Sequence, residues 1–547
     1  MTTKMPPGTI RLTGPDNKII LHPKPTDDYD DPLSQNWSAR RKALHFGIVV
    51  WYTSMTFVLT EEAHVTYTGL QLDLGVSDDD IALERSLSFI GLGLAGIVLI
   101  PLAYRYGRRP LYLMSILTQA AAALWTANVS TKSEYFISSV VTGAAASVSQ
   151  TLVPMTVADL FFVHQFATMN GLFLFAQGTG AFLGPVVVGF VVDAQGWRAA
   201  VRWTAAVLAL TFVLMLLLLE ESTFVPSPPG KNAEGSAAGD EYEHEDEFFN
   251  RPVSWASASD PVDLVDVNRT MTIPTRAVAG LPAPPKTWRQ RFALVTQTKR
   301  PIGKRFTSPF VILVSFPAVA YAAVTYGSVM AWLSVHQHLS AVKLLEAPFR
   351  FDSFDVGLFG LAPFVGHSLG SVVVAALSDR WVVHLARRNG GIYHPEMRLW
   401  LAIPGAVLTC AGILLFGIAI AKEAPVILIG VGSAVFGLGF SICLDVALAY
   451  ITDCYHNMIG DALAGIVFVR NLIAVVVGIA LLPAIQKIGV LHAFIIVAAT
   501  AAAVLLIPVP MMIWGKKARA ATAAKYEHYS LAAIPPASLK RILDEWS

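Results

Sequence analysis

Charged side chains at the edge of the first long apolar run are the first candidates for chemistry in this chain. Glu61, Glu62 and His64 follow directly after an apolar run that begins near residue 43. Two carboxylates and an imidazole at such a place can load a proton or attract a cation. The alternative is that all three side chains are solvated in a loop beyond the run, which is the commoner role of such residues.

Two further charges lie within apolar runs. Asp445 and Arg470 fall inside consecutive runs, and Asn471 follows Arg470. An unpaired charge in an apolar environment costs several kcal/mol. A charged residue there is therefore expected to form an ion pair or to take part in the function of the protein. Consecutive helices are antiparallel neighbours, which predicts an ion pair between Asp445 and Arg470. That pair is either a fixed structural contact or one that breaks as the protein works.

Two more polar residues, Gln177 and His367, interrupt other apolar runs. Each side chain can line a polar cavity or hydrogen-bond a neighbouring helix, and the second role is the commoner one. Both residues are therefore candidates for the path of a substrate or a proton.

Small residues recur at a set spacing in one apolar run. Gly180 and Gly184 are one helical turn apart and form a smooth face that a neighbouring helix can approach closely. Gly171 falls on the opposite face, so we expect this helix to be packed tightly from two sides. Pro185 has no N–H to donate to the preceding turn, so the helix should kink there, and Gly189 follows in the next turn.

The elements that must position these residues are membrane helices. The chain has 547 residues, of which 54% are hydrophobic and 14% are charged, which is too apolar for a soluble protein of this size. The runs are long and continuously apolar, unlike the short alternating strands of a membrane barrel. We predict an all-α membrane protein with twelve spans, near 43–60, 82–103, 110–127, 135–157, 167–192, 199–219, 310–333, 355–377, 399–420, 425–450, 461–484 and 490–514.

Basic residues follow spans 2, 8 and 12, which predicts that these connections and both termini are cytosolic. A connection rich in Pro, Ser, Ala and Gly separates two sets of six spans and is typical of a disordered linker. The predicted parts are an N-terminal segment at 1–42, a six-helix bundle at 43–220, a cytosolic linker at 221–308, a second six-helix bundle at 309–514 and a C-terminal tail at 515–547.

The glycine run resembles the helix-5 motif of drug-proton antiporters of the major facilitator superfamily. That motif reads Gly-x8-Gly-x3-Gly-Pro-x2-Gly-Gly, and this chain departs from it only at Val188. The segment 101–110 resembles the loop motif of the same superfamily, and a second copy begins at Asp379-Arg380. The segments 21–38, 158–162, 388–399 and 453–455 resemble fungal members. The resemblance implies the major facilitator fold, with twelve helices in two six-helix bundles.

The resemblance also implies roles for the loop motif. Gly107 would make the tight turn, and Arg108 and Arg109 would hold the loop at the lipid headgroups. The acid that locks the inner gate in this motif is replaced by Tyr104 in the first copy and is present as Asp379 in the second.

A second departure concerns proton coupling. Related antiporters carry an arginine in helix 4, at the position that is Ser139 in this chain. With that arginine and the first loop acid both replaced, Glu61, Glu62 or Asp445 is left to carry the proton, or the coupling is lost.

Other function classes find no support in the sequence. There is no Gly-x4-Gly-Lys-Ser/Thr loop for ATP, and Cys410, Cys443 and Cys454 have no metal-ligand spacing. No nucleophile and base converge in the spans. We expect a monomer without enzyme activity, metal, cofactor or nucleic-acid partner.

The leading interpretation is a secondary transporter that exports small organic compounds, such as drugs or secondary metabolites, by alternating access coupled to protons. Two alternatives stay open: a proton-coupled importer of an organic cation or nutrient, and a membrane sensor that has lost transport. The plasma membrane is the expected location, with the vacuolar membrane as the alternative. Neither the substrate nor the direction of transport follows from the sequence.

Overall fold

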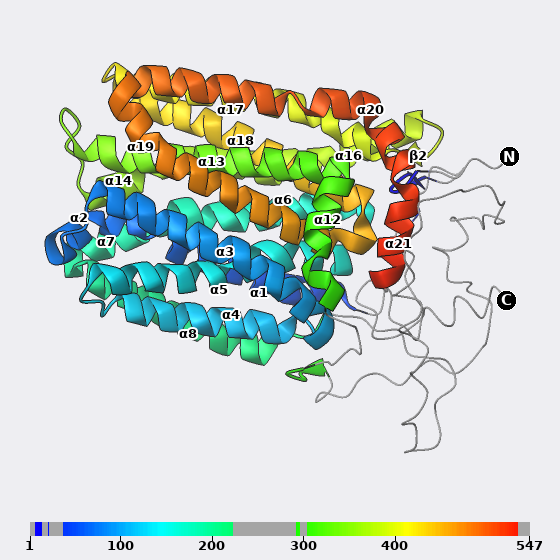
Figure 1. Ribbon diagram of the computed structural model, residues 1–547, viewed down its shortest axis with the longest axis horizontal. Helices are drawn as coiled ribbons and strands as arrows, with labels where there is room; N and C mark the ends of the chain where they lie inside the picture. Colours follow the sequence, from blue (N-terminus) through cyan, green and yellow to red (C-terminus); the bar gives the residue numbers. More distant parts are fainter. Residues whose placement is uncertain (1–5, 14–19, 21–36, 223–290, 296–302, 534–547) are drawn as a thin grey trace.

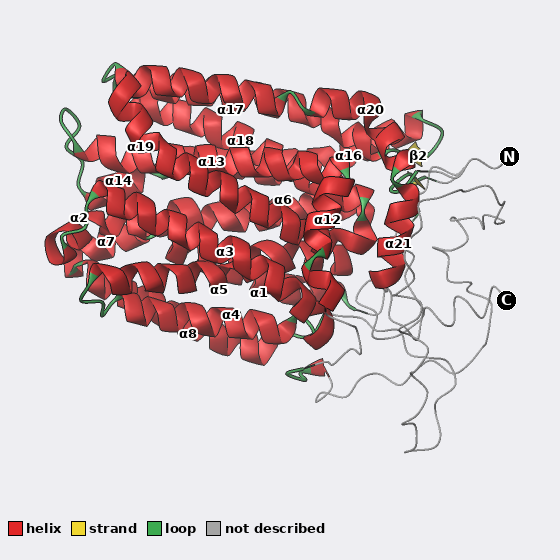
Figure 2. Cartoon of the chain, in the orientation of Figure 1, coloured by secondary structure: helices red, strands yellow, loops and turns green. Residues whose placement is uncertain are grey.

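The computed structural model describes residues 6–13, 20, 37–222, 291–295 and 303–533 (Figure 1). The N-terminal motif at 21–36, most of the predicted linker 221–308 and residues 534–547 of the predicted tail lie outside the described residues. Helices make up nearly all of the described chain (Figure 2).

The first half is built from six membrane helices, two of which consist of consecutive pieces. Its elements are α1 (Ala39–Glu61) with α2 (Ala63–Leu74), α3 (Asp78–Tyr106), α4 (Arg109–Thr126), α5 (Lys132–Leu160), η1 (Val163–Gln165), α6 (Phe166–Gly178) with the π-helical turn η2 (Thr179–Leu183) and α7 (Gly184–Gln195), and α8 (Trp197–Leu218).

The second half also contains six membrane helices. Its elements are η3 (Gly303–Phe306), α12 (Ser308–Ser315), α13 (Pro317–Leu345), α14 (Ser353–Phe359), α15 (Leu361–Ser368), the π-helical turn η4 (Leu369–Val374), α16 (Ala375–Arg388), η5 (Pro395–Leu401), α17 (Ala402–Ala421), α18 (Val426–Cys454), η6 (His456–Met458), α19 (Ile459–Leu505), α20 (Pro508–Ala521) and α21 (Ala523–Ala533). Gly489, with a φ of 77°, breaks α19 into two helices.

Eleven helical stretches of the described chain are long and apolar enough to cross a membrane. The twelfth element is α4, an 18-residue helix that begins with Arg109, contains Gln119 and packs along α5 and α8. The predicted all-α membrane protein with twelve helices in two six-helix halves is therefore confirmed. The predicted boundaries shift, because α1 begins at Ala39 and α20 continues past residue 514 to Ala521.

The two halves lie side by side, with α1, α3, α4, α5 and α8 on one side and α13, α17, α18 and α19 on the other (Figure 1). The α6 helix packs against α16 and α18 of the second half. The helix ends gather in two groups. We call them the Glu61 end, which holds α2, α7 and α14, and the Arg108 end, which holds α16 and α20.

The N-terminal segment crosses to the second half at the Arg108 end. Strand β1 (Ile10–Arg11) pairs antiparallel with β2 (Ile392–Tyr393). Leu12 is fully buried in an apolar cluster that includes Phe46 of α1 and Val382 of α16. The segment thus contacts both halves at once, which no pattern in the sequence predicts.

Candidate functional site

Glu61 and His64 belong to a buried charge cluster that joins the two halves at the Glu61 end. Arg85 Nη2 of α3 donates to Glu61 Oε2 at 2.8 Å and to Gln337 Oε1 of α13 at 3.2 Å. His64 Nε2 lies 3.2 Å from the same Glu61 oxygen and also contacts Arg85 Nη1. We call Glu61, His64, Arg85 and Gln337 the bridging cluster, because α13 belongs to the second half.

The structure overturns the interpretation that Glu61, Glu62 and His64 are solvated in a loop. The α1 and α2 helices form one rod over residues 39–74, so the span is longer than the predicted 43–60. Glu61 is 8% exposed and Glu62 is 6% exposed. Glu62 lies apart from the bridging cluster and accepts a hydrogen bond from Thr204 at 2.8 Å, within the first half.

Arg85 and Gln337 are not among the site residues predicted from the sequence. Arg85 lies inside the predicted span 82–103, so its charge is a signal of the same kind as that of Arg470. Gln337 carries no charge that would mark it within its apolar run. Its contact with Arg85, 252 positions away in the chain, cannot be seen in the local sequence.

The glycines of the fifth membrane helix make the predicted close contacts on two sides. A Cβ at Gly180 would collide with the backbone oxygen of Ser54 in α1, and a Cβ at Gly184 would lie 2.9 Å from Val58 Cγ2. On the other face, Gly171 lies against the backbone oxygen of Ser371 in the second half.

The π-helical turn η2 ends just before Gly184 and Pro185, beside the position where a kink is predicted. Gly189 is buried in α7. This helix therefore changes its geometry at the level where Gly180 and Gly184 touch α1.

His367 of α15 hydrogen-bonds to a neighbouring helix. Its Nε2 donates to the backbone oxygen of Leu174 in α6 at 2.8 Å, and the ring packs against Phe182 and Phe440. Gln177 of α6 is 3% exposed, and its Nε2 makes a weak contact with Met330 Sδ at 3.8 Å. Both residues lie between the halves, and each contacts the opposite half.

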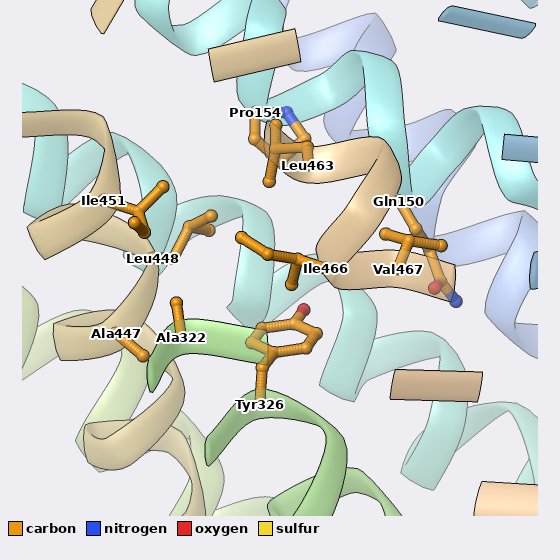
Figure 3. Close-up of a pocket in the computed structure, with 10 residues that line it drawn as sticks. All are labelled: Gln150, Pro154, Ala322, Tyr326, Ala447, Leu448, Ile451, Leu463, Ile466 and Val467. Carbon is orange, nitrogen blue, oxygen red and sulfur yellow. The ribbon is translucent and has the colours of Figure 1, made fainter. Parts of the chain in front are cut away.

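A cavity between the halves is lined mostly by apolar side chains (Figure 3). The first half supplies Gln150 and Pro154 of α5, and the second half supplies the rest from α13, α18 and α19. The ring of Tyr326 points into this space in Figure 3, below Ile466. The complete lining is Gln150, Pro154, Ala322, Tyr326, Ala447, Leu448, Ile451, Leu463, Ile466 and Val467.

The predicted pair between Asp445 and Arg470 is wrong. The Arg470 guanidinium lies 5.3 Å from the centre of the Tyr326 ring and donates weakly to Asn471 Oδ1 at 3.4 Å. Asp445 is 2% exposed and its Oδ1 has no hydrogen-bond partner among the described residues. The two side chains face different groups: Asp445 lies within electrostatic reach of Asp379, Arg398 and Asp453, whereas Arg470 lies beside Tyr326 and within reach of Glu61.

At the Arg108 end, Asp379 of α16 caps the beginning of α6 in the opposite half. Its carboxylate accepts hydrogen bonds from the backbone N–H groups of Ala167 at 3.3 Å and Thr168 at 2.8 Å. It also accepts from Arg398 Nη1 at 3.0 Å. A carboxylate at a helix N-terminus is stabilised by the helix dipole, so this contact favours closure of this end.

Tyr104 takes the corresponding place in the first half. Its ring lies 4.2 Å from the Arg305 guanidinium, and its hydroxyl lies against Gly460 at the beginning of α19. In the first copy of the loop motif, the aromatic side chain of Tyr104 contacts the start of α19. In the second copy, the carboxylate of Asp379 contacts the start of α6. The two copies of the loop motif close this end by different chemistry.

The expected headgroup role of Arg108 and Arg109 is wrong for this structure. Arg108 is 8% exposed and pairs with Asp159, while Arg109 is 2% exposed and donates to the backbone oxygen of Leu216 at 2.7 Å. Arg108 points into its own half, and Arg109 also donates to the backbone oxygens of Phe292 and Ala293, which lie beyond the first half in the chain. Gly107 makes the predicted turn, with a φ of 91°, and Arg380 is exposed.

Comparisons with known proteins agree with this architecture. The chain is 27% identical to the uncharacterized MFS-type transporter C1271.10c of Schizosaccharomyces pombe, over 93% of this chain and 90% of that protein. It is 25% identical to Protein HOL1 of Saccharomyces cerevisiae, over 92% and 90% of the two chains. It is 23% identical to the probable drug/proton antiporter YHK8 of the same yeast, over 90% and 88%.

The fold matches that of a solved proton:xylose symporter, XylE, bound to 6-bromo-6-deoxy-D-glucose. The TM-score is 0.60 at 13% identity, with 87% of this chain and 97% of that chain covered. The family model described as Major Facilitator Superfamily matches residues 44–479, from the first membrane helix to the eleventh. The protein is thus an integral, multi-pass membrane carrier, and the chain belongs to the major facilitator superfamily.

Proposed function

We propose that this chain is a proton-coupled carrier that exports small organic compounds by opening a central site alternately to the two sides of the membrane. The observation that carries this proposal is the bridging cluster, in which a carboxylate of the first half holds the arginine that contacts the second half. A titratable group in this position links protonation to the separation of the halves.

Protonation of Glu61 is the step that we assign to this cluster. A neutral Glu61 no longer attracts Arg85, so the hydrogen bond from Arg85 to Gln337 loses its support and the Glu61 end can open. The charged and titratable groups that face Glu61 are Arg85 and His64, with His338 close to both. Glu84 and Arg470 lie farther away but within electrostatic reach.

The Arg108 end is assigned to the cytosol and the Glu61 end to the outside, as the positive-inside rule indicates. The Asp379 cap on α6 keeps the cytosolic end closed while the outer end opens. In this cycle protons enter from outside as the substrate leaves, and the plasma membrane is the proposed location.

The apolar character of the central cavity's lining favours an organic substrate with an apolar part, which would enter once the halves separate and widen this space. Its side chains are mainly aliphatic, with Tyr326 and Gln150 as the polar contacts and the Arg470 charge behind Tyr326. The similarity to YHK8, a probable drug/proton antiporter, supports exchange of a drug for protons.

Glu61→Gln should make transport independent of the pH gradient, because glutamine keeps the shape of the side chain but cannot take up a proton. The measurement is accumulation of a panel of labelled organic compounds in sealed vesicles that contain the purified protein. Uptake by vesicles with an acidic interior indicates exchange for protons, whereas uptake driven by an acidic exterior would instead favour an importer.

The control is Glu346→Gln, which removes an exposed acid that pairs with Lys343 at the end of α13. It should leave gradient-driven transport unchanged. If Glu61→Gln transports with the full gradient dependence of the parent, the coupling role of the bridging cluster is wrong.

A further inference from the structure

A second cavity lies inside the first six-helix half and is lined by two carboxylates without a basic partner. It is enclosed by α1, α2, α3, α4, α5 and α8, so it is separate from the central cavity in Figure 3. Glu62 and Glu84 both line it. Thr204 donates to Glu62, and within the described residues no ion pair joins either carboxylate to Lys, Arg or His.

Two hydroxyl groups provide an independent sign of a ligand. Tyr135 is 3% exposed and Thr142 is 8% exposed, and both side chains line this cavity. In the part of the chain that the structure describes, neither hydroxyl makes a hydrogen bond. The two side chains are nearly buried, but their hydroxyl oxygens border the open space of the cavity, so a species bound there can supply the partner that the protein does not.

We propose that this cavity binds a small monovalent metal cation, for which sodium is the representative, through the oxygens of Glu62, Glu84, Tyr135 and Thr142. All four side chains offer oxygen, which is the ligand type that hard cations select. Among the described residues no group of three or more His, Cys, Asp and Glu could hold a metal ion. Two carboxylates with neutral hydroxyls suit a single positive charge better than a tight divalent site.

The identity of residue 139 explains why no positive side chain of this protein neutralises Glu62 and Glu84. Ser139 lines the same cavity and donates to the backbone oxygen of Glu84 at 3.0 Å. An arginine at this place would neutralise the carboxylates, but serine leaves them without a positive side chain. Two carboxylates in a poorly solvated cavity are unfavourable unless a cation or protons accompany them.

A bound cation would also act on the bridging cluster. Glu62 directly follows Glu61 at the junction of α1 and α2, and Glu84 directly precedes Arg85 in α3. Each of the two carboxylate ligands is thus the sequence neighbour of one member of the Glu61–Arg85 pair. Filling the cavity would fix the backbone that presents this pair.

The test uses purified full-length protein and needs no transported substrate. Its outcome therefore does not depend on whether the proposed function is correct. The melting temperature is titrated with sodium chloride at constant pH, and choline chloride keeps the ionic strength constant. We expect a saturable rise of a few degrees with sodium and none with choline, because a ligand that binds only the folded state stabilises it.

Variants assign the effect to the cavity. Glu62→Gln and Glu84→Gln should each abolish the sodium-dependent rise, and Glu346→Gln should keep it. Tyr135→Phe preserves the packing of the ring and should weaken the response, which provides a variant if either glutamine variant fails to fold.

An equal response to choline, or a sodium response that persists in both glutamine variants, would overturn the proposal. A melting temperature that responds to pH but not to sodium would show that protons alone neutralise the carboxylates, and would also overturn it.

Discussion

Replacing Gly180 by leucine should abolish transport while the protein still inserts into the membrane. Gly180 touches α1 at the backbone oxygen of Ser54, and a Cβ there would already collide with that atom and with Phe57 Cβ. A backbone oxygen cannot move aside as the end of a flexible side chain can. The larger residue must therefore push α6 and η2 away from α1, which changes the position of the half-helix that carries Gly171 against the second half.

The glycines differ in how much space surrounds them. At Gly184 an added methyl group would lie 2.9 Å from Val58 Cγ2 and 3.1 Å from Val58 Cα, which are milder contacts than the collision with the Ser54 backbone oxygen at Gly180. Gly184→Ala should therefore reduce transport less than Gly180→Ala. Gly47 in α1 has no atom within 4 Å of such a methyl group, so Gly47→Leu is the matched control and should leave transport unchanged.

The measurement is flux in sealed vesicles at equal protein content, with the membrane fraction checked by labelling. Flux at the parent level in Gly180→Leu would mean that the close contact with α1 does not control the movement of this helix. Loss of the protein from the membrane in all of these variants would show a general effect of bulk rather than a specific contact.

The local sequence is enough to predict the helices and their close contacts. Runs of apolar residues predict where each span lies, and the spacing of Gly171, Gly180 and Gly184 predicts which faces touch a neighbour, because helical periodicity relates position to direction. The end of the first span is predicted too early for a physical reason. A pair of acids normally marks the end of an apolar helix, but here α1 and α2 continue through Glu61 and Glu62, which are buried against other helices.

Partners across the molecule cannot be predicted in this way. The expected pair of Asp445 and Arg470 rests on the adjacency of their helices, but adjacency does not fix depth or rotation. Gln337, the contact of Arg85, carries no local signal of its role. Arg398 and Asp453 both lie in segments that resemble fungal transporters, yet resemblance alone does not show that they meet.

Arg398 is the residue whose loss should destabilise the protein most. It is fully buried, and its guanidinium donates to Asp453 Oδ2 at 2.9 Å, to Asp379 Oδ1 at 3.0 Å and to Ser378 Oγ at 3.2 Å. Tyr393 also donates to Asp453. Burial raises the pKa of the Tyr393 phenol well above its usual range, so this group stays a neutral donor and cannot replace the positive charge.

Arg398→Leu should lower the free energy of unfolding by about 3–5 kcal/mol, because it leaves Asp379 and Asp453 buried near each other without a cation. The effect should appear as a lower melting temperature of the purified protein. Arg398→Lys keeps the charge but cannot hold two carboxylates in a planar fork, so it should recover only part of the loss. Arg380→Leu, one position from Asp379 but exposed, is the control and should melt close to the parent. A parent-like melting temperature for Arg398→Leu would mean that the two aspartates are neutral in the folded protein, and then Asp379 would hold the beginning of α6 through hydrogen bonds alone rather than through its charge.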